Sequence, residues 1–448
     1  MTAVHGNRLI FWAITAALAG FLFGFDTVVI SGAEQRIQAL WGLSATLHGL
    51  AISSALWGTV IGALVGGWPT ERLGRTRTLI GVGMLYLVSA VGSALAPEVY
   101  SFMVARFIGG LAVGISTVAA PLYIAEISPP QYRGRLAGMF QFNVVFGILI
   151  AFVSNAILSG IGENAWRWML GIEALPALVF TFLCFLLPES PRWLIAHAGR
   201  RKEGIRVFQL VEPETSHQQL ERRADEIAAG VRKTEHPEKL FARRLRFPIM
   251  LAMLIAFFNQ FSGINAVLYF APRIFEMTGM GQSSALLQSI GLGVINLIFT
   301  IVGLWLIDRA GRRTLLYIGS IGYVVSLGLC SWAFYSETYG LVAVCIFAFI
   351  AAHAIGQGTV VWVFISEIFP NRNRAAGQAL GSFTIWISAA VITFTFPVMA
   401  EYLAPGTIFA FFCFMMVLQL LWVQFLVPET KNVPLEEMQR KLGIAEAS

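Results

Sequence analysis

The chain has 448 residues, of which 57% are hydrophobic and only 12% are charged, and its mean hydropathy is +0.71. So few charges cannot cover the surface of a water-soluble protein of this length, and the composition therefore indicates a chain that uses lipid as its solvent. The formal net charge of +6 does not indicate nucleic-acid binding, because most Lys and Arg stand between apolar runs and are not grouped on a soluble domain.

Residues 1–187 contain six apolar runs that can each cross a bilayer as a helix, since a span takes about 20 apolar residues. The runs cover residues 9–31, 46–69, 78–96, 99–123, 135–159 and 167–187. The first run carries Asp26 and no small-residue cleavage pattern, so we interpret it as a retained helix and not as a signal peptide. Gly58, Gly62 and Gly66 recur at four-residue spacing in the second run, which predicts a close helix contact, either static or sliding.

Residues 188–247 form the only long polar stretch, and we expect them to be a cytoplasmic linker between two halves. Within this stretch, Leu220, Ala224 and Ile227 recur at helical spacing among charged residues. This pattern predicts an amphipathic helix over residues 216–231. The helix either packs against the cytoplasmic face or binds a partner, and linker packing is the commoner use.

Residues 248–430 hold six further apolar runs, and residues 431–448 form a cytoplasmic tail. The runs cover residues 248–272, 284–307, 314–335, 340–365, 376–400 and 406–427. Gly377 and Gly381 predict another close contact in the eleventh run. The cysteines stand inside apolar runs without the spacing of metal ligands, so we interpret them as core residues and expect neither a metal site nor a cofactor. They are Cys184, Cys330, Cys345 and Cys413.

Three polar motifs of the first half return in the second half, in the same order and roughly 240 residues later. They are Glu-Arg-Leu-Gly-Arg at 71–75 and Asp-Arg-Ala-Gly-Arg at 308–312, Glu126 with Arg133 and Glu367 with Arg374, and Pro-Glu-Ser at 188–190 and Pro-Glu-Thr at 428–430. Parallel repeats in one membrane chain are typical of the two halves of a secondary transporter. The sequence therefore predicts an all-α membrane protein with twelve transmembrane helices in two pseudo-symmetric six-helix bundles, accompanied by short cytoplasmic helices.

Lys and Arg are unequally distributed between the two sides of the membrane. If both termini are cytoplasmic, the outer loops hold only Arg36, Arg167 and Arg273. Because cytoplasmic loops are enriched in Lys and Arg, this asymmetry predicts cytoplasmic termini. Short loops and the lack of a targeting extension favour a bacterial inner membrane, and we expect a monomer.

Three ionisable residues, Asp26, Arg106 and Glu173, interrupt apolar helices. Each charge costs roughly 2.5 to 3.5 kcal/mol at the bilayer centre, so the three should face the interior and find partners. Asp26 and Arg106 are the natural pair, and an aspartate that exchanges its arginine contact for a proton is the physical basis of a proton-coupled switch. The alternative is a static ion pair that only fixes helix positions. Glu173 either shares Arg106 or stays protonated.

Four sequence stretches carry a resemblance when they are taken together. They are GFLFGFDTVVISG at 20–32, PESPRWL at 188–194, DRAGRR at 308–313 and PET at 428–430. In this order the chain resembles the sugar porter family of the major facilitator superfamily over essentially its whole length, and five or six motifs in family order are highly specific although each alone is weak. The resemblance implies two six-helix bundles with a central sugar site between them and alternating access by rocking.

The resemblance also implies which residues contact the sugar. Amides donate and accept hydrogen bonds, so they suit sugar hydroxyls, and an indole face covers the apolar side of a pyranose ring. Amides at helix interfaces also serve as packing contacts, which is the alternative. The candidate contacts are Gln141, Asn259, Gln260, Asn265, Asn296, Gln357, Trp362 and Trp386.

The chain departs from the family pattern at several positions in or near this site. Asn259 stands in place of Gln, Ile385 in place of an amide, and Ala354 where animal glucose facilitators carry Glu. Loss of a hydrogen-bonding group can change selectivity greatly, because unpaired polar groups are costly. His353 and Gln357, one turn apart, either supply replacement contacts or, for His353, bond a neighbouring carbonyl.

Charged residues of the polar repeats are expected at cytoplasmic helix ends. The resemblance implies that they form ion-pair networks that hold the inner side shut and break when the carrier opens inward. Exposed pairs are worth about 0 to 1 kcal/mol each, so only a network can bias the rocking equilibrium. The same charges also anchor the topology. The expected gate residues are Arg72, Arg75, Glu126, Arg133, Glu189, Arg309, Arg312, Glu367, Arg374 and Glu429.

The sequence predicts a symporter that imports a monosaccharide, hexose or pentose, together with a proton. The resemblance implies this because proton symporters of the family keep the aspartate of the first helix and the arginine of the fourth, whereas facilitators usually replace that aspartate with asparagine. The alternatives are an uncoupled sugar facilitator, a carrier of a polyol such as inositol or of an organic acid, and a transporter-like sugar sensor. The zincin, phosphate-loop and nucleophile-elbow motifs do not occur, so we expect neither an enzyme nor catalytic residues. The expected partners are the sugar, the proton and the lipid bilayer.

Overall fold

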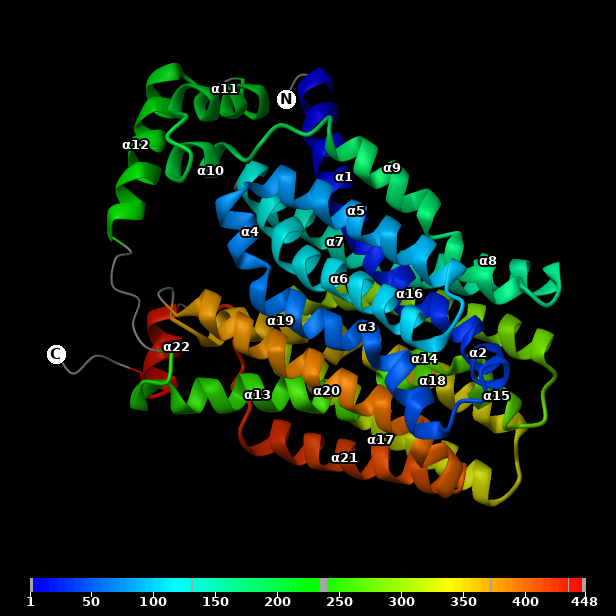
Figure 1. Ribbon diagram of the computed structural model, residues 1–448. Coiled ribbons are helices and arrows are strands. Elements are labelled where there is room, and N and C mark those ends of the chain that lie inside the picture. The colour runs from blue at the N-terminus through cyan, green and yellow to red at the C-terminus, as the bar shows by residue number, and fades with distance from the viewer. Residues whose placement is uncertain are drawn as a thin grey trace.

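The computed structural model describes residues 3–129, 132–213, 215–233, 240–370, 373–433 and 435–444. Throughout these residues the regular structure is helical, without β-strands (Figure 1). Twelve segments of this part of the chain are long and apolar enough to cross a membrane. The predicted all-α membrane fold with twelve transmembrane helices is therefore confirmed.

The first six spans form the N-terminal bundle, which is coloured blue to green in the upper part of Figure 1. Its helices are α1 (Ala3–Val29), η1 (Ile30–Gly32), α2 (Glu34–Leu40), α3 (Ala45–Val65), α4 (Gly67–Arg72), α5 (Arg75–Leu95), α6 (Val99–Ile127), α7 (Arg133–Leu158), η2 (Ser159–Ile161), α8 (Ala165–Gly171) and α9 (Ala174–Cys184). The sixth span, which we expected as one helix, is broken at Ile172 and Glu173, between α8 and α9. This break places a carboxyl group where the helix is interrupted.

A helical linker connects the bundles. Its elements are α10 (Pro191–Ala196), α11 (Arg201–Val211), α12 (His217–Lys233) and η3 (Arg243–Leu245). The amphipathic helix expected over residues 216–231 is observed as α12. Leu220 and Ala224 of α12 are fully buried and pack in one cluster with Ile195, Ile205 and Phe208 of α10 and α11. The apolar face of α12 is therefore covered by the linker itself.

The last six spans form the C-terminal bundle. Its helices are α13 (Arg246–Phe261), α14 (Ile264–Tyr269), α15 (Ala271–Glu276), α16 (Gln282–Ala310), α17 (Arg312–Tyr335), α18 (Gly340–Ile355), α19 (Gln357–Ile368), α20 (Arg374–Tyr402), α21 (Pro405–Phe425) and α22 (Leu435–Lys441). Two of its spans are also broken. Gly263, with a φ of +88°, separates α13 from α14, and Gly356 separates α18 from α19. A positive φ is accessible to glycine without a steric penalty, which explains the break at Gly263.

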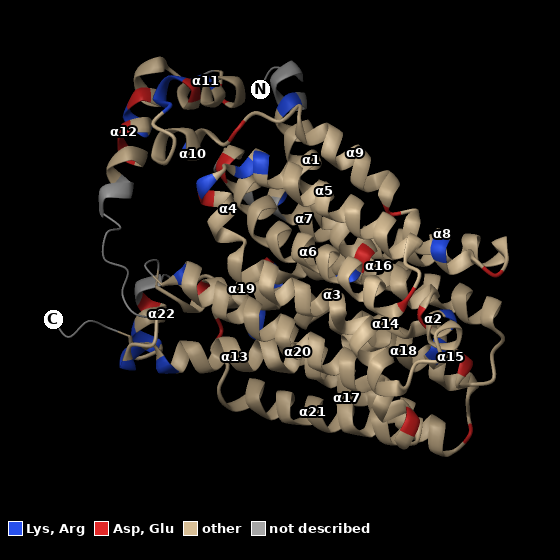
Figure 2. Cartoon of the chain, viewed as in Figure 1, with Lys and Arg blue, Asp and Glu red and all other residues tan. Residues whose placement is uncertain are grey.

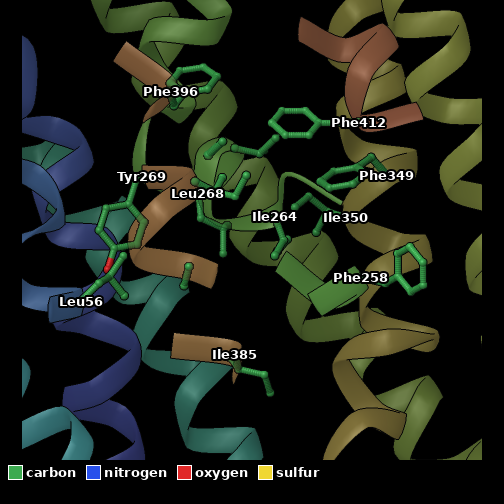
Figure 3. Close-up of a cluster of buried hydrophobic side chains, with 14 of the residues drawn as sticks. Leu56, Phe258, Ile264, Leu268, Tyr269, Phe349, Ile350, Ile385, Phe396 and Phe412 are labelled. Atoms are coloured by element: carbon green, nitrogen blue, oxygen red, sulfur yellow. The ribbon is translucent and has the colours of Figure 1, made fainter. Parts of the chain in front are cut away.

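The two bundles pack against each other mainly through α3 with α20 and through α7 with α16. One cluster of buried apolar side chains extends across both bundles. Figure 3 shows part of this cluster, where Leu56 of α3 lies near Tyr269 of α14. In lipid, such packing and not an aqueous hydrophobic effect drives helix association.

The predicted close contacts at glycines are present, and they lie within each bundle. A Cβ atom at Gly58 or Gly62 of α3 would overlap the backbone of Phe107 or Leu111 of α6. A Cβ atom at Gly381 of α20 would press on Ile365 of α19. These positions therefore serve static packing inside one half, and not a sliding contact between halves.

Charged side chains gather at the ends of the bundles and on the linker helices, whereas the spans are almost entirely uncharged (Figure 2). This distribution is the one that a lipid environment requires, because an exposed charge at membrane depth is expensive.

Candidate transport site

Asp26 of α1 and Arg106 of α6 form an ion pair inside the N-terminal bundle. Arg106 Nη1 donates a hydrogen bond to Asp26 Oδ1 at 2.6 Å, and Arg106 Nη2 donates to the Asp26 backbone carbonyl at 3.0 Å. Each residue is only 1% exposed. Because an unpaired buried charge is strongly unfavourable, the two groups stabilise each other at this depth. The structure thus brings together the two residues that the sequence suggested as a pair.

Glu173 joins this pair from the break between α8 and α9. It is 1% exposed, and its carboxyl group lies close enough to Asp26 and Arg106 to interact electrostatically with both. Glu173 Oε1 has no hydrogen-bond partner among the described residues. Two carboxyl groups close together in an apolar interior do not both ionise readily, because like charges repel. With one proton shared between Asp26 and Glu173, the trio of Asp26, Arg106 and Glu173 would carry no net charge.

Hydroxyl groups surround the trio. Tyr86 of α5 is fully buried and interacts with all three members. Ser89, one turn further along α5, is buried as well, and its Oγ has no hydrogen-bond partner within the described part of the chain. Tyr269 of α14 approaches from the C-terminal bundle, where it interacts electrostatically with the ion pair and lies near Thr27. Sequence reasoning missed these residues, because Ser and Tyr are common in membrane helices and carry no charge signal.

A chain of three amides lies at the break between α13 and α14. Gln260 Nε2 donates to Asn259 Oδ1 at 2.7 Å, and Asn265 Nδ2 donates to Gln260 Oε1 at 2.6 Å. All three residues are buried. The turn at Gly263, against which the Phe412 ring packs, brings Asn265 back toward Gln260. The structure thus places three of the candidate sugar contacts together.

The other candidate sugar contacts are distributed over four helices. Trp386 of α20 is 5% exposed, its indole Nε1 has no partner among the described residues, and its ring meets Phe23 of α1 edge-on at 5.5 Å. Asn296 of α16 is buried, while Gln141 of α7 and Trp362 of α19 are half-buried. The buried indole N–H is a donor that is available to a ligand.

Gln357 and His353 contact residues of their own bundle. Gln357 Nε2 donates to Gln419 Oε1 at 3.0 Å, and Gln419 in turn donates to Ser320 Oγ at 2.7 Å. His353 Nδ1 lies 2.6 Å from the Tyr323 hydroxyl. The Oε1 atom of Gln357 has no hydrogen-bond partner among the described residues. Gln419 and Tyr323 were not identified from the sequence.

The N-terminal polar repeat forms a network at the end of the bundle next to the linker. Arg75 donates from Nε and Nη2 to Glu126, in each case at 2.9 Å, and Ser190 Oγ donates to the same carboxylate. Glu189 accepts hydrogen bonds from the backbone N–H groups of Arg75 and Thr76. Burial raises the pKa of Glu189, and these N–H groups oppose the rise.

The C-terminal repeat builds the same network. Arg312 donates from Nε at 3.0 Å and from Nη2 at 2.8 Å to Glu367, and Thr430 Oγ1 donates to that carboxylate at 2.6 Å. Glu429 accepts from the backbone N–H groups of Arg312 and Arg313. Each network therefore joins helices of a single bundle.

The remaining gate residues are placed differently. Arg72 and Arg309 each stack on a tryptophan of their own helix region, Trp68 and Trp305. Arg374 begins α20 and is half-buried. The side chain of Arg133 lies outside the described residues. The ten positions thus do not form one network within the described part of the structure.

Helices that are broken at membrane depth occur where they line a path for a substrate, and two six-helix halves related by a sequence repeat move around such a path. A protein with both properties is a secondary transporter. Residues 12–442 match the family model described as "Sugar (and other) transporter". The chain belongs to this family, the sugar porters of the major facilitator superfamily, and it is a transporter and not an enzyme.

Known relatives match the sequence of this chain over nearly its whole length. The chain is 35% identical to the arabinose-proton symporter of Bacillus subtilis over 433 residues, which cover 95% of this chain and 93% of the relative. It is 34% identical to the D-xylose-proton symporter of Escherichia coli over 480 aligned positions, which cover 98% and 96%. A solved structure of the xylose transporter XylE from E. coli, in a partially occluded inward-open conformation, matches with a TM-score of 0.85 at 31% identity and covers 95% of this chain and 99% of that one.

Proposed function

We propose that the chain is a symporter that imports a monosaccharide, hexose or pentose, together with a proton by alternating access. The observation that carries the proposal is the buried trio of Asp26, Arg106 and Glu173, which can hold a proton inside the membrane. The names of the relatives, an arabinose-proton and a D-xylose-proton symporter, support it.

The trio couples the proton to bundle movement through its charge balance. When Asp26 and Glu173 share one proton, Arg106 cancels the remaining negative charge and the neutral trio can stay buried. When the proton leaves, the trio carries one net negative charge, which is unfavourable in an apolar interior. Proton release therefore requires that water reaches the trio from one side, and Arg106 then binds Asp26 as its main counter-charge.

The sugar binds at the amide chain of α13 and α14 in this proposal. Gln260 and Asn265 offer donors and acceptors to hydroxyl groups, and the buried indole of Trp386 offers an N–H donor and an apolar face. Asn265 lies only four positions before Tyr269, which interacts electrostatically with Asp26 and Arg106 from the same short helix. Because coupling needs a physical connection between sites, α14 is the element that can transmit sugar binding to the proton site.

The two cytoplasmic networks act as inner gates in this scheme. Each holds the ends of several helices of one bundle in a fixed arrangement, so that the bundle rocks as a unit. Contacts between gate residues of opposite bundles would then form when the inner side closes. We expect these contacts in the outward-facing conformation of the transport cycle.

The protein is a multi-pass membrane protein, and we place both termini in the cytoplasm of a bacterium, with the chain in its inner membrane. The outer loops contain few Lys and Arg, and the relatives named above are bacterial. Twelve spans, an even number, put both termini on the same side.

Replacement of Asp26 by asparagine tests the coupling. In energised vesicles, Asp26→Asn should abolish accumulation of sugar against a gradient, because the amide can neither release a proton nor pair with Arg106 as a charge. Exchange of labelled sugar across the membrane should persist. Asp225→Asn, the same change at an exposed position of α12, is the control and should leave accumulation intact.

Concentrative uptake that survives Asp26→Asn would contradict the coupling assignment. Wild-type uptake that only equilibrates sugar would instead establish an uncoupled facilitator. A competition panel of hexoses, pentoses, inositol and small acids identifies the substrate, and inhibition by inositol or an acid alone would refute a monosaccharide carrier.

A further inference from the structure

A second buried polar cluster lies at the outer ends of the bundles, away from the trio and the amide chain. It comprises Glu34 and Gln38 of α2, His48 of α3 and Arg273 of α15, and we call it the outer cluster. These helices lie at the end of the molecule opposite the linker helices (Figure 1). Because α2 and α3 belong to the N-terminal bundle and α15 to the C-terminal bundle, the cluster joins the two halves.

Arg273 makes all the cross-bundle hydrogen bonds of the outer cluster. Its Nε donates to Glu34 Oε1 at 2.9 Å, and its Nη2 donates to Glu34 Oε2 and to Gln38 Oε1, both at 2.6 Å. A guanidinium that meets both oxygens of one carboxylate is the geometry in which arginine binds most strongly. Separation of α15 from α2 would break these three bonds together.

Glu34 is anchored on the N-terminal side independently of Arg273. His48 Nε2 lies 2.7 Å from Glu34 Oε2, and both side chains are completely buried. A buried carboxylate needs such partners to offset its loss of water. His48 therefore keeps the carboxylate aimed at α15, and it is a positioning residue of the cluster.

The space around Arg273 allows this contact to open. A cavity of about 280 Å³ lies between the bundles beside Arg273 and Gln38, with Glu401 of α20 in its wall. Its walls are mostly apolar, but Gln38, Arg273 and Glu401 give it polar groups, and it is large enough for water, which can solvate a guanidinium that leaves its partner. Figure 2 shows charged residues gathered at the ends of α2 and α15.

A further contact joins the same two helices. Glu276 of α15 lies near Gln35 and Glu34 of α2 and interacts with both. Burial raises the pKa of Glu276, and the nearby Glu34 adds to the rise while Gln35 and Arg273 oppose it. The polar groups of α15 thus face α2 on both sides of the cluster.

We propose that the outer cluster is a latch that holds the outer side of the transport path shut, and that Arg273 is the member that leaves when the path opens outward. The proposal rests on the alternating access proposed above. A contact shifts a two-state equilibrium only if it differs between the states. The three bonds of Arg273 exist only while α15 lies against α2, so they stabilise the outward-closed state alone.

Distances between spin labels test the latch in the full-length protein in lipid bilayers. Labels at Thr46→Cys and Tyr402→Cys, both exposed at the outer ends of α3 and α20, report opening in a background without the four native cysteines. We expect Glu34→Gln and Arg273→Gln each to raise the ratio of outward-open to outward-closed protein about tenfold. The double variant should add little, because both changes remove the same bonds.

Two further variants complete the test. Arg36→Gln removes an exposed arginine from α2 itself and should leave the distances unchanged. Gln38→Ala removes one of the three bonds at a half-buried position and should shift the ratio in the same direction by less, which provides a readout even if Glu34→Gln does not fold.

The outcomes separate the latch from the proposed function. If Arg273→Gln and Gln38→Ala leave the distances unchanged while a mixture of D-xylose, L-arabinose and D-glucose still moves the labels, the latch is wrong and alternating access stands. If the distance between the labels never changes and no sugar is transported, the proposed function is wrong, and the latch, which rests on it, is wrong as well.

Discussion

Gln260 occupies the centre of the amide chain, because its side chain donates to Asn259 and accepts from Asn265. Among the three amides of this hydrogen-bonded chain, Gln260 is the one whose side chain both donates and accepts within it. A sugar hydroxyl that replaces either bond keeps the amide satisfied, so that binding exchanges one hydrogen bond for another without leaving a buried group unpaired.

Removal of this amide should weaken sugar binding strongly. We expect Gln260→Ala to raise the dissociation constant roughly 10- to 100-fold, because a lost hydrogen bond to a buried polar partner costs about 1 to 3 kcal/mol. Equilibrium binding of labelled sugar to purified protein measures it, with the melting temperature recorded in parallel. Gln424→Ala, at an exposed site of α21, is the matched control, and an unchanged affinity in Gln260→Ala would move the sugar site elsewhere.

Single residues differ in how well the sequence identifies them. Asp26, Arg106 and Glu173 stand out because a charge inside an apolar run has no other explanation than a partner in the interior. Glu34 and Arg273 do not stand out, because each lies between the predicted spans, where charges are ordinary. Their contact depends on how α2 and α15 fold back over the bundles, which no local pattern records.

At the scale of single helices, two features matter: breaks within a span and close packing between neighbouring helices. Gly110 of α6 is an example of a close approach, because a Cβ atom at this position would overlap the carbonyl oxygen of Ala55 on α3. Such packing holds α3 and α6 together inside the N-terminal bundle. The four-residue spacing of glycines predicted this kind of contact. The break at Glu173 was not predicted, although Pro176, three residues further on, lacks the backbone N–H that a continuous helix would use.

Substitution of Gly110 should loosen this pair of helices. Gly110→Ala is expected to destabilise the protein by about 3 kcal/mol, because the neighbouring atom is backbone and cannot move aside. Thermal unfolding in one detergent measures it. Gly81→Ala, on α5 with nothing within 4 Å of the added Cβ, should be neutral or stabilise by up to about 1 kcal/mol. Equal melting temperatures of the two variants would contradict the packing argument.

In the molecule as a whole, the repeat in the sequence becomes two matching networks, one in each bundle. In each network an arginine, Arg75 or Arg312, donates to a glutamate, Glu126 or Glu367. A hydroxyl group from the motif that ends the repeat donates to the same glutamate. The repeat was sufficient to predict two halves with matching charged residues. It could not predict which side of the path is closed, because both conformations use the same sequence and differ only in how the bundles meet.

The two networks should differ in strength, because they are not equally buried. The side chains of Arg75 and Glu126 are 5% and 10% exposed, whereas those of Arg312 and Glu367 are 11% and 29% exposed. We expect Glu126→Gln to cost about 3 kcal/mol of stability and Glu367→Gln about 1 kcal/mol, since breaking a pair costs more where water cannot compensate. Denaturant or thermal unfolding of the two variants measures the loss of stability in each. A larger loss in Glu367→Gln than in Glu126→Gln would contradict the argument from burial.

Each network also sets an order of assembly during synthesis. Glu189 and Ser190 complete the first one, so the ribosome has made every member before any residue of α13 emerges. The first bundle can therefore be locked at its linker end while the second is still untranslated. Arg273, 239 residues beyond Glu34, is synthesised much later, so the opposite ends of the bundles can be joined only after the whole first half has been made.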